Sequence, residues 1–297
     1  MKNFKTQILT VTSLLLLALP AFGQIDPSIV FPVPADNDVV HSLGRASRTS
    51  LPQRMKFLVW NLHKGSNDTF DIEYPALSFD RDVIMNQEIF LDENMTTVWR
   101  FMPQFLFTTA TSFFDGKEKI RTGVANISTV TPASTTFLRT KTLEPVIHSP
   151  KVLLISTFPI KNTDKKLTLV NIHGINFVNN RSFELELSRI YDKIKDIPAP
   201  LIFAGDFNTW NDERLAILGQ YAKKLGLSEA KFIPDDRLRF NGRPLDHFLF
   251  TSDIRIISAR VDGIYTGSDH KPLQVELEYS PTTNNGDHST QDFLALH

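Results

Sequence analysis

Cysteine is absent from the 297-residue sequence. Disulfide bonds and thiolate metal sites are therefore excluded, and any metal site would have to use carboxylate, amide, imidazole or water ligands. Such ligands suit hard cations such as Mg²⁺, Ca²⁺ or Mn²⁺. A chain of this length can also bury a sizeable hydrophobic core without covalent cross-links.

The sequence also lacks an excess of either charge. Its formal net charge is −1, and loss of Lys2 and Lys5 from the N-terminus would make it −3. Strong, general affinity for nucleic acid usually needs a basic surface. The composition gives no sign of one, although it leaves room for a local basic groove. With 41% hydrophobic and 22% charged residues, the composition is that of a globular protein.

The sequence has little continuous apolar character outside its N-terminus. One apolar run covers residues 8–19, preceded by Lys2 and Lys5 and followed by small residues. This pattern predicts a signal peptide over residues 1–23, with cleavage before Gln24. The alternative is a membrane anchor, but the run is short for a spanning helix. The expected location is therefore secreted or periplasmic.

Short apolar runs and helical periodicity divide the remaining chain into strands and helices. The proline-rich residues 24–55 are predicted to form an extended lead-in, residues 56–280 the folded domain, and residues 281–297 a polar tail. Strands are predicted at 57–60, 82–87, 151–158, 167–172, 201–204, 247–251, 254–260 and 273–279, and helices at 182–196 and 211–225. This mixture predicts α/β layers around sheets.

Two short segments carry most of the functional information. Residues 205–208 (Gly-Asp-Phe-Asn) end an apolar strand, and residues 268–270 (Ser-Asp-His) follow much later. Because a strand sends residues i and i+2 to the same face, Asp206 and Asn208 would point together into one cleft. With an Asp-His pair, they supply the groups used in metal-assisted hydrolysis of phosphate esters. A simple strand-to-turn junction explains Gly-Asp-Phe-Asn alone equally well.

Other predicted strands also end in polar residues. Taken singly, each has a simpler explanation: Asn61 can cap a turn, Glu88 can be a surface acid, and His173 can be a hydrogen-bonded core histidine. As an ordered set they are far less expected by chance, and strand ends are where catalytic residues concentrate.

These segments resemble the endonuclease/exonuclease/phosphatase superfamily. In chain order, the matching segments are residues 59–61 (Val-Trp-Asn), 86–88 (Asn-Gln-Glu), 170–173 (Val-Asn-Ile-His), 205–208, 245–247 (Leu-Asp-His) and 268–270. They cover roughly residues 56–279. Asn176 and Phe177 after His173, and Trp210 after Asn208, resemble bacterial YafD-like proteins in particular.

The resemblance implies a fold and a set of roles. The fold is a four-layer α/β/β/α sandwich with two mixed β-sheets, and the cofactor is Mg²⁺ or Mn²⁺. The implied metal ligands are Asn61, Glu88 and Asp269. The implied catalytic residues are His173, Asp206, Asn208, Asp246 and His270. The family's chemistry leaves open whether Asp206 or His270 is the general base.

Two basic residues are candidates for contacting a substrate phosphate. Lys64 follows Asn61, and Arg243 precedes Asp246. A solvated loop explains Lys64 more simply, and a surface ion pair explains Arg243 as well as a phosphate contact does. His247 is expected to pack beside the site without being a ligand.

Fold does not fix the substrate, so several functions compete. The favoured one is a secreted metal-dependent nuclease that cleaves DNA or RNA, acts as a monomer and forms no stable membrane association. The alternative is a sphingomyelinase-like phosphodiesterase, which would use an exposed apolar segment at the membrane. Residues 101–107 are a candidate for it, although buried strands explain them more simply. An inositol phosphatase ranks low, because 245–247 is Leu-Asp-His. A non-catalytic binding module would be expected to have lost site residues.

Overall fold

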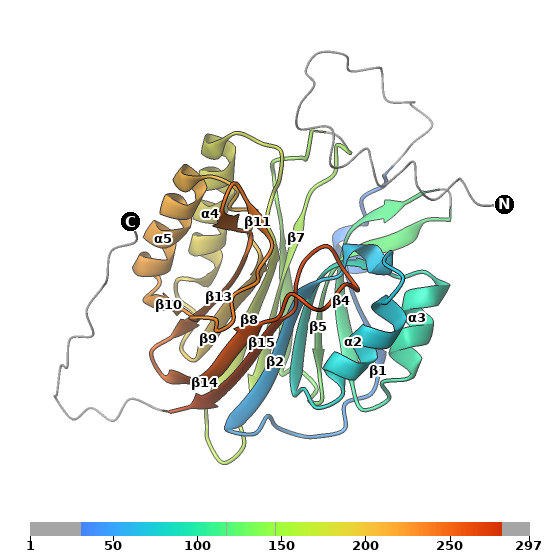
Figure 1. The fold of residues 1–297 in the computed structure, drawn as a ribbon, viewed down its shortest axis with the longest axis vertical. Coiled ribbons are helices and arrows are strands. Elements are labelled where there is room, and N and C mark those ends of the chain that lie inside the picture. The colour runs from blue at the N-terminus through green and yellow to red at the C-terminus, as the bar shows by residue number, and fades with distance from the viewer. Residues whose placement is uncertain (1–30, 117, 146, 281–297) are drawn as a thin grey trace.

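The computed structural model describes residues 31–116, 118–145 and 147–280, and folds them into two facing β-sheets with helices outside (Figure 1). One sheet contains β1 (Val40–Gly44), β2 (Arg54–Asn61), β3 (Val83–Phe90), β4 (Leu106–Asp115), β5 (Ile120–Ser128), β14 (Ile254–Val261) and β15 (Leu273–Tyr279). The other contains β6 (Ser134–Arg139), β7 (Val152–Pro159), β8 (Lys166–His173), β9 (Leu201–Asp206), β10 (Leu227–Glu229) and β13 (Asp246–Thr251). A small separate ladder joins β11 (Arg239–Phe240) to β12 (Arg243–Pro244).

The helices form the two outer layers. The seven-stranded sheet, in the order β1-β4-β5-β3-β2-β15-β14, is covered by α2 (Phe70–Ser78) and α3 (Glu93–Arg100). The six-stranded sheet, in the order β10-β13-β9-β8-β7-β6, is covered by α4 (Asn180–Ile194) and α5 (Asp212–Lys224). Short 3-10 turns, η1 (Asp36–Asp38) and η2 (His63–Gly65), complete the elements. The predicted four-layer α/β/β/α fold is confirmed.

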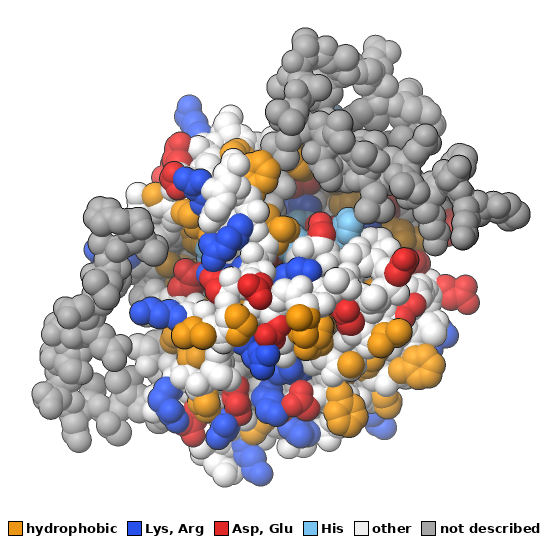
Figure 2. All heavy atoms as spheres, viewed as in Figure 1, with side chains coloured by type: hydrophobic (Ala, Val, Ile, Leu, Met, Phe, Trp, Pro, Cys, Tyr) orange, Lys and Arg blue, Asp and Glu red, His pale blue; other side chains and the backbone are white. Residues whose placement is uncertain are grey.

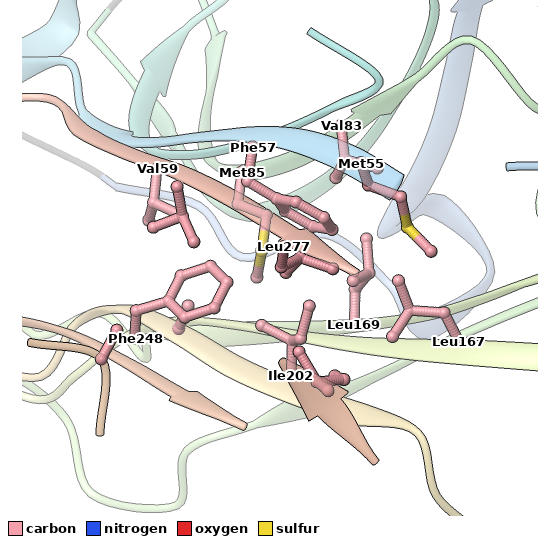
Figure 3. Close-up of a cluster of buried hydrophobic side chains, with 14 of the residues drawn as sticks. Met55, Phe57, Val59, Val83, Met85, Leu167, Leu169, Ile202, Phe248 and Leu277 are labelled. Carbon is pink, nitrogen blue, oxygen red and sulfur yellow. The ribbon is translucent and has the colours of Figure 1, made fainter. Parts of the chain in front are cut away.

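The main core lies between the two sheets (Figure 3). Phe57 and Met85 of the first sheet face Ile202 and Phe248 of the second, and the rings of Phe57 and Phe248 meet edge to face at 5.8 Å. Alternate residues of the same strands point outward and pack under the helices. In the central strands β2, β3, β8 and β9 nearly every residue is buried on one face or the other, so these strands read in the sequence as short apolar runs.

Two parallel strand pairs position the functional residues. β2 pairs with β3, placing Asn61 opposite Gln87, and β8 pairs with β9, placing His173 opposite Asp206. The carboxyl ends of both pairs lie at one end of the sandwich. Contacts between β3 and β8 and between β2 and β9 hold the two sheets together there.

The structure corrects the predicted start of the domain. Residues 24–55 are not simply an extended lead-in, because β1 adds to the sheet beside β4, and Val39 and Leu51 are fully buried. β1 is a short edge strand whose residues are half-exposed or exposed, so no apolar run in the sequence predicts it.

The region after β3 also differs from the prediction. α2 and α3 were not predicted, and the strand proposed within 101–107 begins only at Leu106, leaving Phe101 77% exposed at the end of α3. Residues 1–23 and 281–297, predicted as signal peptide and polar tail, lie outside the described residues. Of the helices in the described part of the chain, none has the length and apolar character needed to span a bilayer.

Candidate active site

The ends of four strands converge on one buried cluster. β2 ends at Asn61, β8 at His173 and β9 at Asp206. β13 runs antiparallel to β9, so its first residue, Asp246, lies opposite Asp206. Gly205 allows this close packing: its φ is 135°, and a Cβ there would lie 2.1 Å from the carbonyl oxygen of Ile172. These strand ends were predicted from the sequence, and the structure brings them together.

Glu88 is aimed into the cluster by a β-bulge. The register between β3 and β5 shifts between Gln87 and Ile89, and Glu88 has a φ of 50°. Bulges re-aim side chains next to active sites. The Glu88 Oε1 atom accepts a hydrogen bond from the Asn61 Nδ2 at 3.1 Å and lies 3.7 Å from the His173 Nε2.

Asp206 lies at the centre of the cluster. Its Oδ2 accepts a hydrogen bond from Asn61 Nδ2 at 3.1 Å and lies 3.7 Å from the Nε2 of His173 and 3.8 Å from the Nε2 of His270. Its Oδ1 accepts the backbone N–H of Asn208 at 2.9 Å. The Asn208 side chain is held in turn, donating to the carbonyl of Gly174 at 3.0 Å.

A second acid orients His270. The Nδ1 of His270 lies 2.7 Å from the Oδ2 of Asp246, and both side chains are buried. Trp60 Nε1 donates to the His270 carbonyl at 3.1 Å. Burial alone would lower the pKa of His270, but the charge and hydrogen bond of Asp246 outweigh it and raise the pKa to about 10. His270 is therefore protonated at neutral pH, with its Nε2 facing Asp206.

The pKa values of the other titratable groups in the cluster differ widely from one another. Burial, reinforced by the charges of Asp246 and Glu88, raises the pKa of Asp206 to about 7 against the opposing charge of His270. Burial also opposes ionisation of Glu88, but the charges of His173 and Lys151 and the Asn61 hydrogen bond lower its pKa to about 2. Burial and Lys151 lower the pKa of His173 to about 3. At neutral pH Glu88 is ionised, His173 is neutral and Asp206 is near its midpoint.

The cluster fits a hard divalent cation. Glu88, His173 and Asp206 each offer a ligand atom, all within 4.8 Å of one another, and within 31–116, 118–145 and 147–280 no other such group of three occurs. Asn61 donates to both carboxylates. Carboxylate-rich donors suit Mg²⁺ or Mn²⁺.

This group shares only Glu88 with the predicted ligand set, and it contains His173 and Asp206 in place of Asn61 and Asp269. Asp269 was predicted beside Asn61 and Glu88, but its side chain is 54% exposed and belongs to the loop before β15, where it accepts the backbone N–H of His270 at 3.0 Å. Its Oδ1 lies 3.8 Å from the Nδ1 of His63. A direct ligand role for Asp269 stays a prediction.

Sequence reasoning missed one cation of the cluster. The Lys151 Nζ lies 3.4 Å and 3.3 Å from the two ring nitrogens of His173, and 3.4 Å from Glu144 Oε2. Its side chain is only 12% exposed. In the sequence Lys151 precedes an apolar strand, where a lysine looks like an ordinary strand start. Glu144, which holds it, lies in an irregular loop.

The two predicted phosphate contacts are engaged elsewhere. Arg243 forms a bidentate ion pair with Asp212 at 2.7 and 2.6 Å. Lys64 pairs with Asp115 at 2.5 Å and lies over the ring of Phe90. The structure thus forms the surface ion pair that was the alternative for Arg243. Substrate contacts by either residue stay predictions.

Known proteins resemble this chain both in sequence and in fold. The model of the endonuclease/exonuclease/phosphatase family matches residues 58–270. A UPF0294 protein of Vibrio cholerae is 32% identical over 232 residues, which cover 76% of this chain and 79% of that protein. An endonuclease/exonuclease/phosphatase structure from Beutenbergia cavernae superposes with a TM-score of 0.63 at 14% identity, covering 76% of this chain and 72% of that one. TDP2 of D. rerio superposes with a TM-score of 0.56 at 16% identity, covering 76% and 99%. The resemblance inferred from the motifs is confirmed, and the chain belongs to the endonuclease/exonuclease/phosphatase family.

Proposed function

We propose that the protein is a metal-dependent phosphodiesterase that cleaves nucleic acid. Its family generally comprises hydrolases of phosphate esters. The observation that carries the proposal is the buried Asp206 carboxylate, whose Oδ2 accepts a hydrogen bond from Asn61 and lies 3.7 Å from His173 Nε2 and 3.8 Å from His270 Nε2. Burial raises the pKa of Asp206, whereas nearby charges lower that of Glu88. Separated pKa values of neighbouring groups mark acid and base roles.

Asp206 is the better general base. A base must accept a proton at the working pH, and its pKa is best near that pH. Asp206 meets this condition, whereas the pKa of His270 near 10 keeps that ring protonated. Asp206 therefore orients the attacking water and takes its proton, and His270 donates a hydrogen bond to a phosphate oxygen through Nε2.

The remaining side chains bind and orient the phosphodiester. The amide of Asn208 and the ammonium of Lys151 offer donors for the non-bridging oxygens, where charge develops in the transition state. Neutral His173 carries one ring N–H that it can give to the leaving oxygen. Glu88, with Asn61 beside it, would hold a divalent cation, which when bound neutralises phosphate charge.

Nucleic acid is the substrate we favour. TDP2 of D. rerio, which shares the fold, has been solved with a single-strand DNA product. The predicted signal peptide over residues 1–23 points to a secreted or periplasmic enzyme, and we expect it to act as a monomer. Figure 2 shows acidic and basic side chains intermingled on one face of the molecule, which suits weak binding through a few phosphate contacts.

One observation favours the lipid alternative. Phe101 and Phe79, at the ends of α3 and α2, are 77% and 80% exposed, and exposed aromatic side chains can anchor an enzyme at a membrane surface. A phospholipid headgroup presents the same phosphodiester to the same cluster. The two substrates are therefore separated by assay.

The test is hydrolysis by the purified protein in Mg²⁺ of plasmid DNA, RNA, sphingomyelin vesicles and a bis-aryl phosphodiester. We expect nicking of DNA with little sequence preference, loss of all turnover in EDTA, and recovery with Mg²⁺ or Mn²⁺. Full activity in EDTA without bound metal would overturn the mechanism. Headgroup release without any nicking would reject the nuclease assignment and leave the metal chemistry standing.

A further inference from the structure

An exposed aromatic ring sits on a strained backbone close to the cluster. Phe177 lies in the connection between β8 and α4, its φ is 54°, and it is 53% exposed. A positive φ is an outlier for a bulky residue. Such strain persists only where surrounding structure imposes it, and it concentrates at functional sites.

One hydrogen bond within the loop and two to neighbouring segments hold this conformation. The backbone N–H of Asn176 donates to Glu144 Oε1 at 2.9 Å. The Asn176 Oδ1 accepts the backbone N–H of Phe177 at 2.8 Å and the Nε1 of Trp210 at 3.1 Å. The loop is therefore fixed to the segment before β7 and to the segment after β9, while the ring of Phe177 stays partly in solvent.

Arg214 of α5 also fixes this loop. Its side chain is fully buried and its guanidinium donates to the carbonyls of Ile175 at 3.2 Å and Val178 at 2.7 Å, on either side of Phe177, and of Asn208 at 2.9 Å. The guanidinium carbon lies 4.4 Å from the ring centroid of Trp210.

Burial lowers the pKa of Arg214 to about 10, so the group is still charged at neutral pH. A buried cation is expensive, and the charge of Glu144 offsets the effect of burial on Arg214 only in part. Its three donated bonds all fix the two loops that follow His173 and Asp206.

The loop is also joined to the catalytic residues. Gly174 N–H donates to the Asp206 carbonyl at 2.6 Å, and the Gly174 carbonyl accepts the Asn208 side chain at 3.0 Å. Phe177 comes four positions after His173, so their Cα atoms are at most about 14 Å apart. The Phe177 backbone therefore lies near that of His173, whose ring belongs to the cluster.

We propose that Phe177 contacts the substrate by stacking on an unpaired nucleobase next to the scissile phosphate, which makes single-stranded nucleic acid the preferred substrate. The inference rests on the proposed function. Base stacking on an aromatic side chain needs an open base face, which a duplex does not offer. A membrane anchor would want apolar neighbours, whereas Phe177 is followed within four residues by Asn179, Asn180 and Arg181.

Binding without turnover tests the contact directly. A dye-labelled single-stranded oligonucleotide is titrated in EDTA and followed by fluorescence anisotropy. We expect F177A to bind on the order of 10-fold more weakly than the unchanged protein. F177Y, which keeps the ring, should bind normally, and so should F79A, which removes a still more exposed phenylalanine elsewhere. An abasic strand should bind the unchanged protein and F177A equally. Equal affinity of F177A and the unchanged protein for the base-bearing strand would overturn the proposal.

Turnover separates this proposal from the proposed function. In Mg²⁺, F177A should raise KM for the base-bearing strand and leave cleavage of the abasic strand unchanged. If the unchanged protein cleaves no phosphodiester, the proposed function fails, whereas equal losses on both strands defeat only the stacking role. Loss of vesicle binding by F177A with normal oligonucleotide binding would assign Phe177 to a membrane instead.

Thermal unfolding checks the strain on which the inference depends. F177A and F177G both lack the ring, but glycine adopts a φ of 54° without a Cβ penalty. We expect F177G to melt about 2 °C above F177A. F177L, which keeps an apolar side chain without an aromatic face, replaces F177A if that variant does not fold, and should show the same weak binding.

Discussion

Two carboxylate–imidazole pairs meet at β13, and only one of them belongs to the proposed site. Asp246 pairs with His270 at 2.7 Å, and its neighbour His247 pairs with Glu229 at 2.8 Å. Successive strand residues point to opposite faces, so the two pairs lie on different sides of the sheet. Their near-identical distances show that pairing alone does not identify a catalytic histidine.

The surroundings of the two pairs make the difference. His270 faces a second carboxylate, Asp206, at 3.8 Å, whereas the remaining ring nitrogen of His247 is taken by the Thr209 hydroxyl at 2.7 Å. One pair therefore keeps a donor for a substrate, and the other is closed by protein partners. A free ring nitrogen beside a carboxylate with a raised pKa is what makes chemistry available.

Removing either central group should give the largest loss. We expect Asp206→Asn and His270→Ala to lower kcat by about 10²–10⁴-fold, because each removes a base or a transition-state donor. Steady-state kinetics on a bis-aryl phosphodiester, with circular dichroism to confirm folding, measures this. Wild-type turnover by His270→Ala would contradict its placement at the phosphate.

Lys151 should matter less, because in the proposed mechanism it is one phosphate donor among several. We expect Lys151→Met to lower kcat/KM by about 10- to 100-fold, as loss of a single electrostatic donor does. Lys151→Arg should recover part of the loss. If Lys151→Met left kcat/KM unchanged, the ammonium would serve only to fix Glu144 and His173.

The pH dependence of activity tests the role of Asp206, the carboxylate that His270 faces. The raised pKa of Asp206 means that it is protonated, and inactive as a base, below about pH 7. Activity should fall about 10-fold per pH unit below that midpoint, and a bound cation, which favours the carboxylate, should move the midpoint lower. Profiles of kcat/KM measured at several Mg²⁺ concentrations check both effects. A midpoint that rises with Mg²⁺ would contradict the assignment.

Sequence reasoning recovered what local pattern encodes. Apolar runs located β2, β8 and β9, and polar residues at their ends, such as Asn61 and His173, lie together in the structure. Strands buried on both faces appear in the sequence as clear apolar runs, and the side chains at the ends of parallel strands must lie at one edge of a sheet.

The missed features depend on contacts between distant segments. Contacts with Glu144 and His173 position the Lys151 side chain, and hydrogen bonds to carbonyl oxygens of another loop position Arg214. An arginine in an amphipathic helix ordinarily reads as a solvated residue, so nothing local marks Arg214 as buried. β1 was missed for a different reason, since an edge strand with exposed residues lacks periodicity.

The smallest effect on activity is expected from the closed pair. His247→Ala should change kcat by no more than a few-fold but lower Tm by several degrees, because it removes a buried side chain and its contacts with Glu229 and Thr209, which keep only Arg237 and the Pro244 carbonyl as partners. Burial opposes ionisation of Glu229, but its hydrogen bond from His247 and nearby charges lower its pKa to about 2. A lowered carboxylate pKa contributes stability above the unfolded value of about 4.3, and that stability is lost as the pH falls towards 2. The Tm difference between the two proteins should therefore be full at neutral pH and shrink between about pH 4.3 and the lowered pKa. Scanning calorimetry across this range measures it, with Glu229→Gln as the matched variant. A His247→Ala variant more damaging to kcat than His270→Ala would reverse the roles of the two pairs.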